Sequence, residues 1–389
     1  MLRALPPVGL PMTISDLRAG LASARDGEGA IAAFSADLRR TFGVEHVALA
    51  SSGRAALSML LRGLHLLHPD RDVVALPAYT SFSVPSAVVN AGFRVALYDL
   101  DPWTLSPVPE SLARAVDHRT LAVVLCHLFG YPADLDLVRQ VAATGGAFVI
   151  DDAAQAMGGE FRGKPVGSCG DAGLFSLSRG KNINALDGGI IVTRRDDLAA
   201  ALESLPRLEG GEGTTRLFFK ALFLSALIRP RLYWLPRSLP FLRIGASLYD
   251  PRFSREPFTP FQAGIARRML ARLPEVTAGR RGVARDLLQR LSGIPGVQSA
   301  GSAIHGESVC LRLPVMISQG RPVTENPLLG VVRSYPAPLC AIAPLLPHLV
   351  DGSGRYPGAE LLAGRLLTLP THQFVTPGDR TRIVAFLKK

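Results

Sequence analysis

A single lysine stands among small polar residues and glycines in the stretch FSLSRGKNINALDGG, residues 175–189. The ε-amine of a lysine can form a Schiff base with a carbonyl compound, and burial or a neighbouring charge makes the amine more reactive. The paired Gly188 and Gly189 allow backbone to approach closely and lead into an apolar strand. A solvated surface lysine is the alternative for Lys181 when this stretch is taken alone.

Two carboxylates end a strongly apolar run, AFVIDDAAQA at residues 147–156. A buried carboxylate is costly unless it meets a cation, so Asp152 is placed to pair with a positively charged group. A protonated pyridine nitrogen would serve, and holding that proton makes pyridoxal phosphate an electron sink. Gln155 would share a face with Asp152 if a helix begins here, and could hydrogen-bond a ring substituent. The alternative is that Asp151 and Asp152 merely cap a helix.

A candidate anion site lies in ASSGRAAL, residues 50–57, which follows an apolar strand and opens a helix. Hydroxyls and backbone N–H groups at Ser52 and Gly53, together with a helix N-terminus, suit a phosphate. Arg54 could add a charged fork, and Ser176 is a further candidate phosphate ligand. An ordinary serine N-cap is the alternative. No GxxxxGK[ST] is present and no strand is followed by GxGxxG, so P-loop and dinucleotide-binding interpretations fail.

These residues all belong to a region in which apolar β-branched runs alternate with helix-like stretches. The runs are at residues 46–50, 72–77, 94–101, 120–128, 147–156 and 188–193. This alternation predicts an α/β fold with a parallel sheet covered by helices on both faces. Ligands of such sheets bind beyond the carboxyl ends of the strands, where the candidate residues lie.

The bulk composition predicts a large folded protein with two domains. The 389 residues are 48% hydrophobic and 19% charged, enough for a sizeable core. We place the boundary near residue 275, giving a large domain at 1–274 and a small C-terminal domain at 275–389. The four cysteines form no CxxC pair or zinc-spaced cluster, so we expect reduced thiols and no metal site. Without a signal-like or membrane-spanning run, we expect a cytoplasmic protein.

The formal net charge of +11 needs a separate explanation. No nucleic-acid-binding motif is present, so we expect no nucleic-acid partner. Residues 216–249 carry six basic side chains and no acid among Phe, Leu, Trp and Tyr. This composition suits peripheral contact with an anionic membrane at its inner face. The alternative is that the segment packs on the large domain or on a dimer partner, with its arginines reaching outward.

The order and spacing of the motifs resemble those of the DegT/DnrJ/EryC1/StrS aminotransferases, the sugar-aminotransferase branch of the fold-type I pyridoxal-phosphate enzymes. The resemblance covers most of the chain. It rests on FSADLRRTFGVEHVALASSGRAAL, LPAYTSFSVPSAVVNAGFRVALYDLD, CHLFGYPADLDLV, IDDAAQAMGGEFRGKPVGSCGDAGLFSLSRGKN, FQAGIARRML and RLLTLPTH. It implies the fold-type I architecture, with a large, mostly parallel sheet covered by helices and a smaller C-terminal α/β domain.

The resemblance also implies a role for each matching residue. Lys181 matches the lysine that forms a Schiff base with pyridoxal phosphate, Asp152 matches the partner of the pyridinium, and Gln155 matches the partner of a cofactor oxygen. The residues that match phosphate ligands are Ser52, Gly53 and Ser176. Family members that act as dehydratases carry histidine in place of the lysine, so Lys181 implies transamination.

Three departures from the family pattern concern the cofactor and the dimer. Arg54 stands where the family often has threonine. Ser81 stands at the usual position of the ring-stacking aromatic residue, so we assign Phe82 to the ring, with Tyr79 as the alternative. The stretch SREPFTPFQ, residues 254–262, lacks the asparagine that commonly reaches the neighbouring subunit, although the resemblance still implies a homodimer.

The function that the resemblance implies is transfer of an amino group, from glutamate to a keto-sugar carried on a nucleotide. Two alternatives stay open. The first is a membrane-surface enzyme or binding protein of the same fold, acting on a lipid-linked substrate. The second is a sugar dehydratase that uses the same cofactor.

Overall fold

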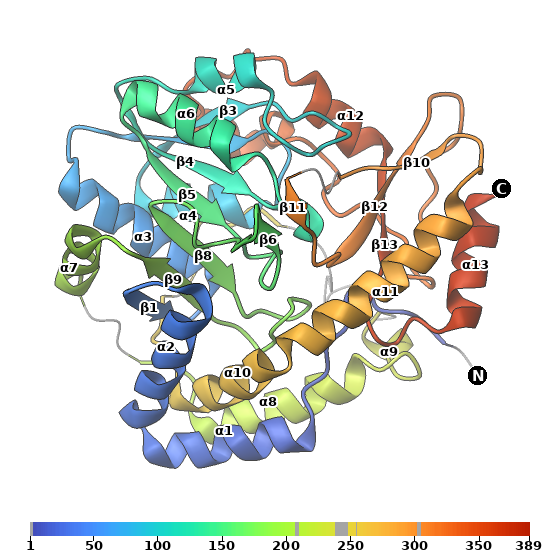
Figure 1. Cartoon of the computed structure of the whole chain (residues 1–389), viewed down its shortest axis with the longest axis horizontal. Coiled ribbons are helices and arrows are strands. Elements are labelled where there is room, and N and C mark those ends of the chain that lie inside the picture. The colour runs from blue at the N-terminus through green and yellow to red at the C-terminus, as the bar shows by residue number, and fades with distance from the viewer. Residues whose placement is uncertain (1–2, 207–209, 238–247, 254, 302–304) are drawn as a thin grey trace.

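A seven-stranded mixed sheet forms the centre of the molecule (Figure 1). The computed structural model describes residues 3–206, 210–237, 248–253, 255–301 and 305–389. The sheet has the order β1-β9-β8-β5-β4-β2-β3. Its strands are β1 (His46–Ala50), β2 (Val73–Pro77), β3 (Arg94–Tyr98), β4 (Thr120–Cys126), β5 (Phe148–Asp152), β8 (Ala172–Ser176) and β9 (Gly189–Thr193). Only β9 runs against its neighbours, β8 and β1, which confirms the predicted mostly parallel sheet.

Helices cover both faces of this sheet. Successive side chains of a strand point to opposite faces, and every residue of β2, β4, β5, β8 and β9 is buried, which shows that both faces are covered. The helices of this part are α1 (Ile14–Asp26), α2 (Glu28–Phe42), α3 (Gly53–Leu67), α4 (Ser83–Ala91), α5 (Pro109–Ala115), η1 (Leu128–Gly130), α6 (Leu135–Gly145), α7 (Asp196–Ser204) and α10 (Pro260–Ala271). α1 and α10 pack closely because Gly20 and Gly264 lie at their contact: a Cβ on Gly264 would come within 2.6 Å of the Ala19 carbonyl oxygen.

A second, smaller sheet lies toward the C-terminus, with the order β10-β12-β13. Its strands are β10 (Val297–Ser299), β12 (Arg312–Ile317) and β13 (Leu366–Pro370). It shares a separate apolar core with α11 (Leu273–Leu291) and α13 (Pro377–Leu387). Shorter elements elsewhere in the described residues are β6 (Glu160–Phe161), β7 (Lys164–Pro165), β11 (Gly306–Glu307), η3 (Leu339–Ala341), η4 (Ala343–His348) and α12 (Pro357–Arg365).

The two parts of the chain are linked by more than one connection. α11 begins beside the predicted boundary at 274/275 and reaches from the first core at Leu273 to the second core at Leu287. β11 pairs with β6, and residues from Tyr335 to Leu366 pack on the core of the large sheet. The division into 1–274 and 275–389 therefore stays a prediction.

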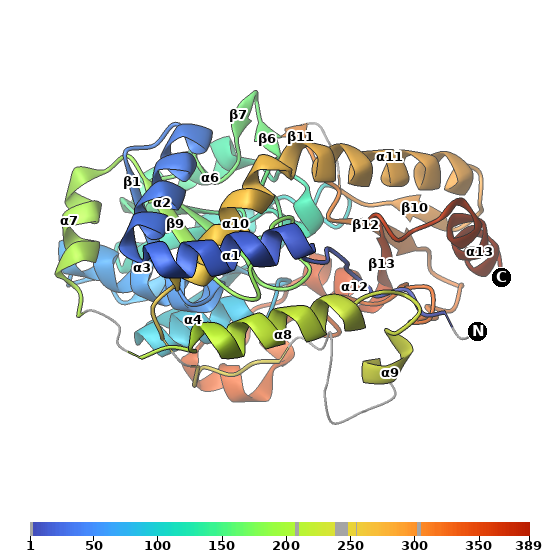
Figure 2. The ribbon, with the colours of Figure 1, turned by 90° about the horizontal axis from the view of Figure 1, so that it is seen from below.

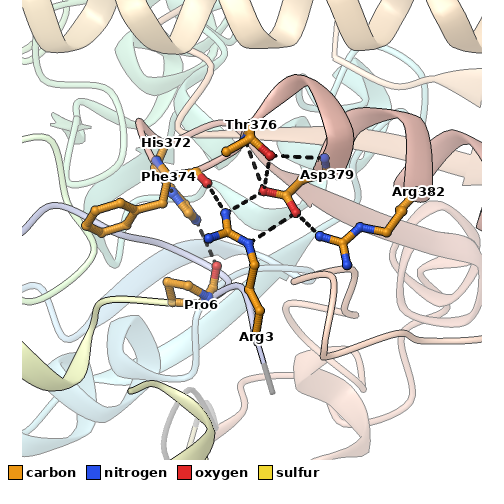
Figure 3. A network of polar contacts seen from close by, with 7 residues as sticks. All are labelled: Arg3, Pro6, His372, Phe374, Thr376, Asp379 and Arg382. Atoms are coloured by element: carbon orange, nitrogen blue, oxygen red, sulfur yellow. Dashed lines mark hydrogen bonds and ion pairs between the residues drawn. The ribbon is translucent and has the colours of Figure 1, made fainter. Parts of the chain in front are cut away.

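The N-terminal segment is tied to α13 by a polar network (Figure 3). The Arg3 guanidinium donates to the Asp379 carboxylate at 2.6 Å and to the Phe374 carbonyl at 2.9 Å. Burial lowers the pKa of His372 to about 3, so its ring is neutral, and Nε2 lies 2.8 Å from the Pro6 carbonyl oxygen that it donates to. His372 therefore holds the N-terminal segment in place.

The basic apolar segment 216–249 begins in α8 (Thr214–Leu227) and continues through α9 (Trp234–Arg237), and its residues 238–247 lie outside the described part. Figure 2 shows α8 running beside α1. The Met12 N–H donates to the buried Ser225 hydroxyl, whereas the rings of Phe219 and Phe223 are exposed. Within the described ranges, no helix combines the length and apolar character needed to cross a membrane.

Candidate active site

A cavity of about 890 Å³ lies where the carboxyl ends of β5 and β8 meet the beginning of α3. All the predicted site residues except Phe82 border it, from three separate stretches of the chain. They are Ser52, Gly53, Arg54, Asp152, Gln155, Ser176 and Lys181. The inference that the strand ends would bring these side chains together is therefore met by the geometry.

Asp152 is the last residue of β5 and is buried against the cavity. Its Oδ1 accepts a hydrogen bond from the Ala154 N–H at 3.0 Å, and its Oδ2 accepts one from the Cys126 thiol at 3.5 Å. Burial raises the pKa of Asp152, while the Ala154 N–H and the nearby Lys181 ammonium act in the opposite direction. A cation placed here would be strongly favoured, because a buried carboxylate is stabilised by an adjacent positive charge.

Asp151, one residue earlier, points away from the cavity because side chains alternate along a strand. Its Oδ1 lies 2.6 Å from His127 Nε2, and its Oδ2 accepts from the backbone N–H groups of Gly167 and Cys169. The alternative that the two carboxylates cap a helix is wrong, since residues 154–158 form turns. Asp151 instead holds the loops that surround β5.

Lys181 follows β8 in the loop that leads to β9, and its half-buried side chain borders the cavity. Burial lowers the pKa of the amine, and the carboxylates of Asp152 and Asp187 partly offset this effect. A lowered pKa increases the neutral fraction of the amine, the form that attacks a carbonyl or accepts a proton.

The N-terminus of α3 and the end of β8 form a polar cradle. Ser52 caps the helix, its Oγ accepting from the Ala55 N–H at 3.1 Å. A Cβ on Gly53 would lie only 3.0 Å from the Cβ of Ser176, so glycine permits the close approach of these two elements. The Arg54 guanidinium also borders the cavity and lies over the Phe253 ring, 4.9 Å from its centroid. Hydroxyls, a helix N-terminus and a cation suit a phosphate.

Gln155 organises an aromatic wall that the sequence analysis did not identify. Its Oε1 accepts from the Phe129 N–H at 2.9 Å, and its Nε2 donates to the Tyr335 hydroxyl at 2.7 Å. The Phe129 and Tyr335 rings stack with centroids 5.8 Å apart, and both border the cavity. Phe129 has a φ of 58°, a strained value for a non-glycine residue. Phe129 belongs to the HLFG stretch that directly follows β4, a place visible in the sequence, whereas nothing local marked Tyr335.

Phe82 does not border the cavity, although Ser81 and Ser83 on either side of it do. It is buried at the start of α4, where its carbonyl accepts from the Ser86 hydroxyl. The alternative, Tyr79, is buried with its ring edge against Tyr335. Contact of Phe82 with a cofactor ring thus stays a prediction, and Phe129 is an aromatic residue already on the cavity wall.

The donor set fits pyridoxal phosphate at each of its polar ends. The cradle of Ser52, Gly53 and Ser176 suits the phosphate, and the Lys181 amine suits the aldehyde. The buried Asp152 carboxylate suits the protonated ring nitrogen. The cradle is also closely packed, because a Cβ at position 53 would lie 3.0 Å from the Ser176 Cβ, closer than most side-chain contacts.

Comparisons with known proteins agree with this arrangement. The model of the DegT/DnrJ/EryC1/StrS aminotransferase family matches residues 19–233, more than half of the chain. GDP-perosamine synthase of Caulobacter vibrioides is 29% identical over 352 residues, covering 89% of this chain and 85% of that protein. L-glutamine:2-deoxy-scyllo-inosose aminotransferase of Streptoalloteichus tenebrarius is 37% identical over 178 residues, or 46% of this chain and 42% of that protein.

A solved structure extends the likeness along the whole chain. The structure of DesI in the presence of its TDP-sugar product superposes with a TM-score of 0.78 at 25% identity, covering 100% of this chain and 93% of the other. The chain belongs to the DegT/DnrJ/EryC1/StrS aminotransferase family, and it is a pyridoxal-phosphate-dependent enzyme of the sugar-aminotransferase type.

Proposed function

We propose that this enzyme moves an amino group from L-glutamate to the ketone of a nucleotide-linked sugar, in the synthesis of a glycan or surface polysaccharide. The observation that carries the proposal is the position of Lys181 and Asp152 on one cavity with a phosphate cradle. The names of two relatives support the acceptor class: one is a GDP-perosamine synthase and the other was solved with a TDP-sugar. A third is named for L-glutamine as donor, so both donors deserve testing.

The residues divide the work by their chemistry. Pyridoxal phosphate supplies the carbonyl carbon and the electron-withdrawing ring. Ser52, Gly53 and Ser176 would hold its phosphate, and the Asp152 carboxylate would keep a proton on its ring nitrogen. The Lys181 amine would accept and return the α-proton of the donor, a role that its lowered pKa favours.

The decisive experiment follows nitrogen. The holoenzyme is incubated with ¹⁵N-labelled L-glutamate, or ¹⁵N-amino-labelled L-glutamine in a parallel reaction, and a TDP- or GDP-linked 4-keto-6-deoxy sugar. We expect an aminated nucleotide sugar carrying ¹⁵N and one equivalent of 2-oxo acid, detected by mass spectrometry. A dehydrated sugar without ¹⁵N would instead support the dehydratase alternative. An unchanged sugar with every acceptor would contradict the proposal.

We also propose a homodimer and a peripheral membrane contact through α8 at the inner face of the membrane. The exposed face of α8 carries Phe219, Leu222 and Phe223 on a helix without acidic residues, a surface that suits anionic lipid. Sedimentation velocity tests the dimer, and a monomer at micromolar concentration would contradict it.

The membrane contact predicts a difference between two variants. A phenylalanine ring that inserts into lipid contributes roughly 1.5–3 kcal/mol to membrane binding. The double variant Phe219→Ser/Phe223→Ser should therefore bind phosphatidylglycerol vesicles roughly 100-fold more weakly. Leu66→Ser removes an exposed leucine outside α8 and should leave co-sedimentation unchanged. If the double variant keeps vesicle binding, or if it only converts a dimer to monomers, α8 is not a lipid-binding surface.

A further inference from the structure

Residues 3–12 form a strap, without helix or strand, that is tied to the C-terminal part of the chain. The buried Asp379 carboxylate at the start of α13 accepts hydrogen bonds from the Arg3 guanidinium, with Nη2 2.6 Å from Oδ2 (Figure 3). Farther along the strap, the Pro6 carbonyl accepts from His372 Nε2 at 2.8 Å. Charge-assisted bonds to a carboxylate are short and strong, so this end of the strap is firmly held.

The strap then packs against the loop of Lys181, which joins β8 to β9 at the cavity. Gly180 has a φ of 90°, and a Cβ at this position would overlap the Val8 side chain, so glycine permits the close packing. After the lysine, the buried Asn184 side chain donates through Nδ2 to the Leu10 carbonyl at 2.9 Å. The strap therefore contacts the loop both before and after Lys181.

The strap supports this loop together with the turn that follows β5. In that turn, the Met157 carbonyl accepts from Asn182 Nδ2 at 2.9 Å. The Lys181 N–H donates to the Ser178 carbonyl at 3.2 Å, a bond within the loop itself that ties it to neither support. The position of the Lys181 amine therefore depends on both supports. A displacement of a reacting group by about 1 Å can lower a rate roughly 100-fold, so this dependence has a consequence for the chemistry.

We propose that the strap positions Lys181, with Arg3 and Val8 as its positioning residues. This inference rests on the role proposed for Lys181. Arg3 fixes one end of the strap to α13, and Val8 packs on Gly180, the residue directly before the lysine. The strap thereby holds the amine in a fixed place relative to the C-terminal part of the chain.

The test compares Arg3→Met and Val8→Ala with the matched control Arg382→Met. Arg3 and Arg382 both pair with Asp379, but only Arg3 belongs to the strap (Figure 3). Hydrogen–deuterium exchange of the holoenzyme, measured by mass spectrometry on peptides that cover residues 177–188, reports how often the loop opens. We expect about tenfold faster exchange in Arg3→Met and Val8→Ala, because loss of a charge-assisted hydrogen bond or of two packed methyl groups shifts an opening equilibrium by about that factor. Arg382→Met should match the wild type.

A second measurement reports the placement of the amine itself. Pyridoxamine phosphate has the ring and phosphate of the cofactor but no aldehyde for the Lys181 amine to meet. The full-length chain is titrated with pyridoxal phosphate and with pyridoxamine phosphate by calorimetry. Arg3→Met should bind pyridoxal phosphate several-fold more weakly than the wild type, because a looser loop must be ordered when the lysine engages the aldehyde. Its affinity for pyridoxamine phosphate should stay within about twofold of the wild type.

Each other outcome has a defined meaning. Unchanged exchange over residues 177–188 in both Arg3→Met and Val8→Ala would overturn the proposal. Equal acceleration in Arg3→Met and Arg382→Met would also overturn it, because the effect would then come from α13 and not from the strap. If Arg3→Met does not fold, Val8→Ala decides by the same exchange measurement. Failure of the proposed function is separable: Lys181→Ala would then keep the absorption band of the cofactor, while the exchange difference between Arg3→Met and Arg382→Met would remain.

Discussion

Lys181→Ala should lower turnover by about 10⁴-fold, the upper range for loss of a positioned acid–base group. Lys181 borders the cavity together with Asp152, and its lowered pKa makes its amine available for attack and proton transfer. Alanine keeps the backbone and removes only the amine. The visible absorption band of bound pyridoxal phosphate should be lost or shifted in the variant, and addition of glutamate should then change nothing.

The matched control for this prediction is Lys164→Ala, which removes an exposed lysine of β7 outside the cavity. Its spectrum, its response to glutamate and its turnover should equal those of the wild type. Circular dichroism and the thermal midpoint report whether Lys181→Ala keeps the fold. A variant that still bleaches the band with glutamate at the wild-type rate would exclude Lys181 from the chemistry.

Asp152→Asn should lower turnover, whereas Asp151→Asn should lower stability, although the two residues are adjacent. Asp152 faces the cavity. The neutral amide of the Asp152→Asn variant would not favour a proton on the ring nitrogen of the cofactor, as the carboxylate does. We expect turnover to fall by about 100-fold or more, since each lost unit of the ring pKa corresponds to about 1.4 kcal/mol. The thermal midpoint should change little, because Asp152 accepts only one backbone N–H and a weak thiol bond.

Asp151→Asn should leave the chemistry of bound cofactor intact and destabilise the protein. Its carboxylate joins His127 to the backbone of Gly167 and Cys169, and breaking such a buried network costs about 3 kcal/mol. Urea unfolding monitored by circular dichroism measures this loss, and steady-state kinetics of the folded fraction measures turnover. Equal loss of turnover in both variants would mean that strand alternation does not separate their roles.

Cys126 illustrates a contact that no local pattern predicted. Its thiol donates to Asp152 from the neighbouring strand β4, because Cys126 and Asp152 are paired in register across the sheet. Sequence shows each strand but not which residues of two strands face one another. The same limit applies to Tyr335, which lies 180 positions from its partner Gln155.

Phe82 marks a second limit, at the level of single side chains. The pattern around residue 82 correctly predicted a strand followed by a helix, seen here as β2 and α4. It could not decide which side chain of the connecting turn points into the cavity. Ser81 and Ser83 border the cavity and Phe82 is buried elsewhere, because small changes in backbone dihedral angles redirect neighbouring side chains.

The sequence by itself predicted a mostly parallel sheet, the succession of strands and helices along the chain, and the candidate residues Lys181, Asp152, Ser52 and Gly53. It could do so because parallel strands have a strong apolar signature and their carboxyl ends converge on one edge. Only the tertiary structure decided that Asp151 is structural and that the strap of residues 3–12 packs against the loop of Lys181. Those outcomes depend on the packing of distant segments, in which burial sets the free energy of each charge.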